Sequence, residues 1–271
     1  MSRDSEQDLV ALKEWMSKQP HLPHDLDGLL LNFLHSCYYS LEKTKLCIDN
    51  FCSTRALMPE VYINRDPLSP TLVVAANTFN DNYEYMIYKY DDPTLETFRF
   101  YEVVKCISVL ADIWVKSSPP LVEGHYIIID MTHFSLKMLP KINIMYFRDF
   151  VMYLLEAMPV RVKKIIGVNA PTFYDKLYAF IKPVLPSEIH SIIHFFTDLE
   201  GLHQMIDKKY LPKEYGGDAQ GIYEQSRGWR KKIEVERKFF ANDHSWKADI
   251  KKKPKSCDKT MSGSFRTLSI D

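Results

Sequence analysis

The sequence predicts an α/β protein with a mainly parallel sheet, preceded by a small helical lobe. Residues 1–60 carry apolar residues at helical spacing, and β-rich runs then alternate with helical stretches. From Gly221 onward the chain is polar. Strands that alternate with helices are typical of a sheet covered by helices. We therefore expect a helical lobe over 1–65, an α/β domain over 66–220, and a C-terminal helix with a basic tail over 221–271.

The lobe is predicted to contain three short helices. The apolar residues of "EQDLVALKEWMSKQP" recur at helical spacing until Pro20. "DGLLLNFLHSCYY" and "SLEKTKLCIDNFCSTRAL" follow, with Ser40 as N-cap of the second, and Pro59 closes the unit. Short connections between short helices favour a small bundle packed on the next domain.

The α/β domain is predicted from a run of alternating segments. The expected strands are "TLVVAAN", "YEYMIYKY", "GHYIIID", "VKKIIGVN" and "IHSIIHFF". The expected helices are "TFRFYEVVKCISVLADIWVKS", residues 139–156, "NAPTFYDKLYAFIKPVLP" and a helix ending at "KKYLPKEYGG". After them, "EQSRGWRKKIEVERKFF" is predicted to form a last helix, and residues 247–271 have the composition of a disordered basic tail.

Composition excludes several classes of function. The 271 residues carry 35 basic and 35 acidic side chains, so no overall field indicates a nucleic-acid partner. The polar start "MSRDSEQDLV" argues against a secretory signal, and no apolar run approaches the roughly 20 residues of a membrane span. Five cysteines form no CxxC pair and are expected to be free. We expect a cytoplasmic monomer without a cofactor.

Catalytic motifs are absent from the sequence. No GxGxxG, P-loop, GxSxG or HExxH pattern occurs. His190 and His194 have a metal-like spacing, but two polar rings on a half-buried strand are the better interpretation. Asp130 ends a strand beside Thr132 and His133, and capping of the turn is favoured over catalysis there. We therefore expect a protein that is not an enzyme.

The segment Asn169 to Pro186 carries more apolar residues than a surface helix needs. Thr172 and Asp175 suggest a capping box that starts the helix, and Pro183 ends it. A large core would explain the surplus, and so would a helix that closes an apolar cavity. Composition leaves both interpretations open.

Several motifs together resemble one family. They are "QPHLPHDLDGLLLNFLHSCYYSLEKTKLCIDNFCSTRALMPE", "GHYIIIDMTHFS", "MPVRVKKIIGVNAPTFYDKLYAFIKPVLP" and "LPKEYGG", in that order over about residues 5–220. They resemble the CRAL-TRIO family of retinaldehyde-binding, tocopherol-transfer and phosphatidylinositol-transfer proteins. The resemblance implies a three-helix lobe and an α/β/α lipid-binding domain, in which a mixed, mainly parallel sheet floors an apolar cavity beneath a mobile gate helix.

The resemblance also implies which residues meet the ligand and the membrane. The implied pocket residues are Val104, Ile107, His125, Ile127, Ile129, Phe134, Leu154, Met158, Ile165, Tyr174, Leu177, Tyr178 and Ile181. The implied gate and membrane contacts are Phe173, Phe180, Val184 and Leu185. For each pocket residue, ordinary core packing remains an alternative.

Basic residues near the gate are implied to read phosphoinositide headgroups. Arg55 and Arg161 match two such positions, and Lys163 and Lys164 lie nearby. Glu188 and Ile192 stand where the family has a lysine and an arginine, which weakens the site because a carboxylate repels phosphate. A generic basic surface is the alternative, and the lysines of residues 251–255 either attract anionic membranes or only solubilise the chain.

The implied function is a carrier. It would bind one hydrophobic molecule, a retinoid, tocopherol-like or other isoprenoid lipid, and move it between membranes through peripheral contact. A phospholipid-exchange protein and an interaction module without transfer activity remain as alternatives.

Overall fold

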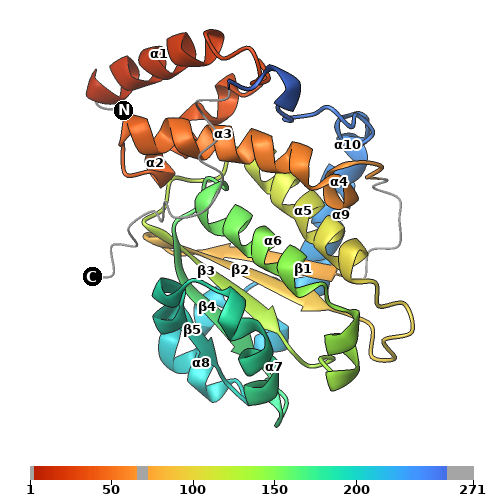
Figure 1. The fold of residues 1–271 in the computed structure, drawn as a ribbon. Coiled ribbons are helices and arrows are strands. Elements are labelled where there is room, and N and C mark those ends of the chain that lie inside the picture. The colour runs from red at the N-terminus through yellow and green to blue at the C-terminus, as the bar shows by residue number, and fades with distance from the viewer. Residues whose placement is uncertain (1–2, 66–72, 255–271) are drawn as a thin grey trace.

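The computed structural model describes residues 3–65 and 73–254 (Figure 1). A helical lobe lies above the sheet, and the C-terminal helices run from the sheet up to the lobe. Within these described residues, no helix combines the length and the apolarity that crossing a bilayer requires.

The lobe contains the predicted helices and one further turn. They are α1 (Arg3–Ser17), α2 (Leu30–Ser36), α3 (Leu41–Leu57) and α4 (Pro59–Tyr62). Ser40 is the N-cap residue of α3, although its side chain makes no capping hydrogen bond. Pro59 opens α4 instead of ending the unit, which suits a residue whose missing N–H costs nothing in a first turn.

The sheet is mixed and mainly parallel, as predicted. Its strands are β1 (Val73–Phe79), β2 (Tyr83–Tyr90), β3 (Gly124–Asp130), β4 (Val162–Val168) and β5 (Ile193–Phe195), in that spatial order. β1 and β2 form an antiparallel hairpin, and β2 to β5 run parallel to their neighbours. The side chain of Asn80 accepts hydrogen bonds from the N–H groups of Asn82 and Tyr83, which fixes the hairpin turn.

Helices cover both faces of the sheet. One face packs against α5 (Phe100–Lys116), α6 (Ile144–Glu156) and α7 (Tyr174–Ile181), and the opposite face packs against α8 (Glu200–Met205). α9 (Ile222–Val235) lies beside β1 and continues into α10 (Arg237–Phe240). Figure 1 shows α5 and α6 crossing between the lobe and the sheet.

Three predicted elements have a different form. The helix expected to end at "KKYLPKEYGG" stops at Met205, and Lys208–Tyr210 and Lys213–Tyr215 form separate 3₁₀ turns. "IHSIIHFF" was expected as one strand, but residues Ser187–Ile192 form a 3₁₀ helix and only Ile193–Phe195 pair with β4. The helix expected over 139–156 begins at Ile144, where the side chain of Asn143 accepts a hydrogen bond from the N–H of Tyr146 (3.1 Å). Before it, Leu136–Lys141 form a 3₁₀ helix that contains Pro140.

A buried ion cluster joins the lobe to the domain. Arg55 of α3 and Arg65 both bind the carboxylate of Asp112 on α5, and all three side chains are at most 2% exposed. The guanidinium carbon of Arg55 lies 4.2 Å from the ring centre of Phe51 and 4.5 Å from that of Tyr62. Buried cations are stable only when paired and enclosed in this way.

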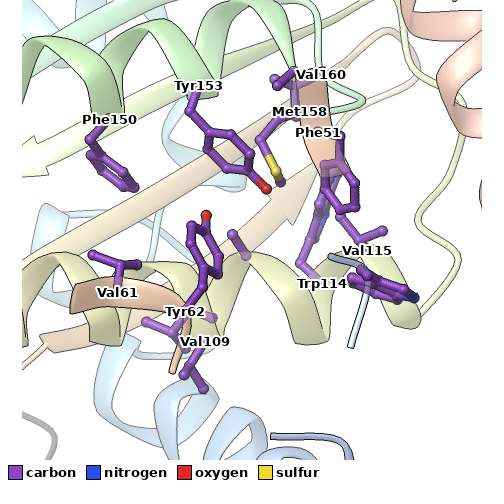
Figure 2. Packing of buried hydrophobic residues seen from close by; sticks show 14 of the residues in the cluster. Phe51, Val61, Tyr62, Val109, Trp114, Val115, Phe150, Tyr153, Met158 and Val160 are labelled. Atoms are coloured by element: carbon purple, nitrogen blue, oxygen red, sulfur yellow. The ribbon is translucent and has the colours of Figure 1, made fainter. Parts of the chain in front are cut away.

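Aromatic packing surrounds this cluster. Figure 2 shows Tyr62 of α4 and Tyr153 of α6 pointing toward one another, and their ring centres lie 5.7 Å apart. Phe51 lies edge-on to Phe33 at 5.2 Å and stacks on Tyr153 at 6.0 Å. The lobe and the α6 side of the domain therefore share one hydrophobic core.

Residues 246–253, which we call the C-terminal strap, return to the lobe. The N–H of Ala248 donates to the carbonyl of Cys52 (3.0 Å), and the N–H of Asp249 donates to the carbonyl of His21 (2.8 Å). Lys253 pairs with Asp49 at 2.7 Å. The prediction of a disordered tail from residue 247 is therefore wrong up to residue 254, and residues 255–271 lie outside the described part of the chain.

Candidate ligand site

The two faces of the central strands differ in how completely they are covered. Ile128 of β3 and Ile166 of β4 are 0% exposed, and they point toward α8. Ile127, Ile129 and Ile165 point to the opposite face, toward α6 and α7, and remain partly exposed. Apolar side chains in the middle of a sheet that keep accessible surface are typical of a binding site.

The partly exposed face is ordered in rows across the sheet. Met86 of β2, Ile127, Ile165 and Ile193 of β5 are neighbours in one row. The next row joins Tyr88, Ile129, Gly167 and Phe195. The floor predicted from β3 and β4 thus extends over four parallel strands.

Side chains from α5, α6 and the segment after β3 line the same apolar cluster. Ile107, Phe134 and Leu154 are partly buried there, whereas Val104 and Met158 are 3% and 2% exposed. All five belong to the large hydrophobic core that the lobe and the α/β domain share. Val104 and Met158 pack inside the core behind the accessible surface.

The predicted gate, α7, covers the β5 edge of this face. Its Tyr174 stacks on Phe195 with ring centres 5.3 Å apart, and Tyr178 meets the same ring at 5.5 Å. Ile181 packs against the apolar cluster, and Leu177 is partly buried. None of the eight residues of α7 is buried, so the helix rests on the face without being embedded in it.

The start of α7 corrects one prediction. The helix begins at Tyr174, and its N-cap residue is Phe173, which makes no side-chain capping bond. The capping box of Thr172 and Asp175 is therefore wrong. Without such a cap, the first turn of α7 loses a stabilisation that is typically about 1 kcal/mol.

The predicted membrane contacts do not all face outward. Phe173, Phe180 and Val184 are partly exposed, whereas Leu185 is only 9% exposed and belongs to the core. Leu185 follows the 3₁₀ turn Lys182–Val184, so the chain turns inward at that point. The accessible apolar residues of this segment thus lie before Leu185.

A polar network occupies the lobe-side end of the face. His125 lies 3.5 Å from Glu84, which accepts a hydrogen bond from the indole of Trp114 at 2.8 Å. Nδ1 of His125 accepts from the backbone N–H of Arg161 (3.0 Å). His125 is 4% exposed, so it belongs to this closed end and not to the accessible floor. The sequence offered no signal for its partner Glu84.

The basic residues predicted to bind phosphoinositides do not form one surface. Arg55 is fully buried and neutralised by Asp112, so its assignment as a headgroup ligand is wrong. Arg161 donates to the carbonyl of His35, and its side chain is 6% exposed. Lys163 packs against Gly124, and both lysines, 163 and 164, are partly exposed.

Glu188 and Ile192, which stand at the family's basic positions, are respectively exposed and buried.

Asp130 caps the end of β3, as predicted. It accepts hydrogen bonds from the N–H (3.0 Å) and the hydroxyl (2.5 Å) of Thr132. Sequence reasoning missed two further donors, the hydroxyl of Tyr215 (3.1 Å) and the amide of Asn169 (3.1 Å). Burial and the charge of Asp130 raise the pKa of Tyr215, which therefore stays a neutral donor. This network ties "LPKEYGG" to the sheet.

His190 and His194 do not share a site. His190 lies in the 3₁₀ helix with its ring edge-on to Tyr178, whereas His194 is on β5, where burial lowers its pKa and the charge of Lys164 lowers it further. Within residues 3–65 and 73–254, no three His, Cys, Asp or Glu side chains are grouped to hold a metal ion. The described cysteines are free thiols, and Cys37, Cys47 and Cys52 are buried, as predicted.

The comparison with family models matches this architecture. A model described as CRAL/TRIO domain matches residues 68–217, and a model described as Pinta-like, UBA domain matches residues 1–72. Since the first match covers more than half of the chain, the protein belongs to the CRAL/TRIO domain family, as the sequence motifs predicted.

Individual relatives are similar over part of their length. The human protein named alpha-tocopherol transfer protein-like is 27% identical over 224 residues, which cover 78% of this chain but 65% of that relative. Rat Clavesin-1 is 28% identical over 119 residues, covering 44% of this chain and 34% of that protein. The solved structure of Sfh5 superposes with a TM-score of 0.49 at 14% identity, over 83% of this chain and 91% of that one.

Proposed function

We propose that this protein is a non-enzymatic carrier of one small hydrophobic lipid, held between the sheet and α6 and α7. The lipid class is a retinoid, a tocopherol-like molecule or another isoprenoid. The family membership and the name of the human relative support a lipid carrier. The observation that carries the proposal is that Ile127, Ile129 and Ile165, on one face of the sheet in the middle of the fold, stay partly exposed.

Burial of such a lipid is strongly favourable. A ligand with some 400 Å² of apolar surface gains roughly 10 kcal/mol at about 25 cal/mol per Å², before the costs of association. Release into water would therefore be very slow. A carrier with this affinity needs an opening step that a membrane favours.

α7 is suited to that step. Its inward aromatic rings meet two side chains, Phe195 and His190, and no residue of the helix is buried, so little packing is lost when it moves. Its partly exposed Phe173 and Phe180 prefer a bilayer interface to water. Binding of these side chains to the interface would stabilise the open position, expose the floor and release the lipid by peripheral contact.

The proposal does not include a specific phosphoinositide site. Arg55 and Arg161 are both occupied within the protein, and Glu188 adds a negative charge beside the gate. Lys163 and Lys164 are partly exposed, and as a generic basic surface their charges add modest attraction to anionic lipids.

The gate is tested by Phe173→Asp combined with Tyr178→Asp. Charge on α7 disfavours both the closed position and the bilayer interface, so we expect transfer of a fluorescent tocopherol analogue between vesicles to fall at least tenfold. The matched control also introduces two aspartates, at exposed aromatic residues away from α7. These residues are Phe79 and Tyr223, which are 40% and 37% exposed.

We expect the control to transfer like the wild type. Equal transfer by all three proteins, with unchanged circular dichroism, would remove α7 as the gate. Mass spectrometry of lipids that co-purify with the native protein tests the carrier itself: one equivalent of an isoprenoid supports it, phospholipid indicates an exchange protein, and a protein that takes up no lipid is an interaction module.

A further inference from the structure

Tyr88 carries a hydroxyl group into the floor of the proposed site. It lies on β2 and is the cross-strand neighbour of Ile129 and of Ala75. Its side chain points to the face of α6 and α7 and packs with the partly buried residues of that apolar cluster. Ala75 has only a methyl group, so its side chain covers little of the ring of Tyr88.

The phenol of Tyr88 is surrounded by protein, and its side chain still keeps some accessible surface. Burial raises the pKa of its phenol, and the charge of Glu84 raises it further, so the hydroxyl stays neutral at every physiological pH. The side chain nevertheless remains partly exposed, unlike Met86 and Tyr90, its same-face neighbours along β2, which are 4% and 5% exposed. A group that protein atoms enclose, and that still has accessible surface, faces an internal space.

The hydroxyl of Tyr88 has no hydrogen-bond partner within the described parts of the chain, 3–65 and 73–254. Two other phenols of β2 differ: Tyr90, at the same end, donates to Asp92 (3.1 Å), and Tyr85, on the opposite face, accepts from Asn80 (2.7 Å). An enclosed hydroxyl without a partner is destabilising, and a ligand oxygen would remove that cost.

The charges around the site select a neutral ligand. The fully buried cations Arg55 and Arg65 are both committed to Asp112. The buried charge nearest along β2 is the acidic Glu84, about 13 Å from Tyr88 by strand geometry. A carboxylate or phosphate placed at Tyr88 would lose its hydration without gaining a counter-ion.

We propose that Tyr88 is the polar anchor of the site and selects a neutral lipid with a terminal hydroxyl or carbonyl oxygen. This inference rests on the proposed carrier function and names the chemical class of its ligand. From Tyr88 the floor extends across β3 and β4 to β5, roughly 14 Å away at the usual strand spacing. The apolar part of the lipid then lies on Ile129 and reaches the aromatic contact between Phe195 and α7.

The experiment compares Tyr88→Phe with the wild type against matched probes. One set is retinol, the hydrocarbon that lacks its oxygen, and retinoic acid; the second is phytanol, phytane and phytanic acid. Tyr126→Phe is the control, because it removes a phenol hydroxyl from the adjacent strand on the opposite face. Affinities are measured by titration with the purified full chain.

We expect the wild type to prefer the alcohol of at least one set to both its hydrocarbon and its acid. Tyr88→Phe should weaken binding of that alcohol about three- to tenfold and leave the affinity for the hydrocarbon unchanged, whereas Tyr126→Phe changes neither. Loss of alcohol and hydrocarbon affinity together would show a structural effect and overturn the inference, as would a preference for the acid. Failure of every probe to bind the wild type would overturn the carrier function itself.

Discussion

Two helices of this protein, α3 and α7, show opposite relations between composition and burial. In α3, nine of 17 residues are buried, among them Asn50, Thr54 and Arg55. α7 is the more apolar helix, yet none of its eight residues is buried. The difference arises because α3 is enclosed by α6, α4 and the C-terminal strap, whereas α7 rests on one edge of the sheet.

This contrast separates a fixed part of the molecule from a part that is free to move. Burial of polar side chains requires partners with defined positions, and α3 has them in Asp112, Lys253 and the aromatic rings around Arg55. An apolar helix without buried residues has few contacts to lose, so its position is the one that a ligand or a membrane can change.

The largest effect should come from Asp112→Asn. Burial raises the pKa of Asp112, but Arg55 and Arg65 outweigh burial and hold it below its usual value, so the group is charged in the native state. Removal of that charge leaves two buried guanidiniums unpaired, and we expect the free energy of unfolding in urea to fall by about 3–5 kcal/mol.

Asp149→Asn is the matched control, because Asp149 pairs with Arg148 where both side chains are about 40% exposed. Its loss should change stability by less than about 1 kcal/mol. If both substitutions lowered the free energy of unfolding by similar amounts, the ion cluster on α3 would be no more important for stability than a surface ion pair.

A smaller effect on the lobe is expected from acid. Burial lowers the pKa of His35 on α2 to about 4, with a further contribution from the charge of Arg161. The unfolded chain therefore binds this proton first, and the stabilisation is complete above about pH 6.5 and is lost as the pH falls toward 4.

In His35→Gln, the loss of unfolding free energy between about pH 6.5 and pH 4 should be smaller by about 1 kcal/mol. This figure allows for the partial exposure of His35. Urea midpoints at several pH values measure it, with the exposed His24→Gln as control. An unchanged profile in His35→Gln would exclude His35 as the group responsible.

The smallest effect should be that of Phe180→Ser on α7. Phe180 is partly exposed and lies on a helix without buried residues, so we expect the free energy of unfolding to change by less than about 0.5 kcal/mol. Phe51→Ala on α3, where the ring is 0% exposed, should cost about 3–5 kcal/mol in the same assay. Comparable losses would show that α7 is part of the fixed core.

The strands were the part of the fold that local sequence patterns could predict. "GHYIIID" became β3 with the predicted bounds, and Asp130 capped it, because an apolar run ended by a turn residue is a local signal. The mixed, mainly parallel sheet and the family followed from such segments in order. The predicted floor residues Ile127, Ile129 and Ile165 do share one face, since strand periodicity dictates it.

The features that the sequence did not reveal arise from contacts between residues far apart in the chain. The family resemblance implied that Arg55 binds a headgroup, and its sequence neighbours do not reveal its counter-ion, Asp112, which lies 57 residues away. Residues 247–254 were interpreted as disordered because their lysines are the local signal, whereas Trp246 packs against Phe51 of α3 and Phe239 of α10, and Ala248 is hydrogen-bonded to α3. Tyr88 was not predicted as a site residue, because the sequence around a tyrosine does not show whether its hydroxyl has a hydrogen-bond partner.

The C-terminal strap has a consequence for how the protein is made. Lys253 pairs with Asp49 across a separation of 204 residues, and the strap covers α3 only after that length of chain has been synthesised. The N-terminal helices therefore emerge from the ribosome first but cannot complete their packing, and they wait with their apolar surfaces uncovered. We expect this lobe, despite its position at the start of the chain, to be among the last parts to fold, and to be the segment that chaperones protect during translation.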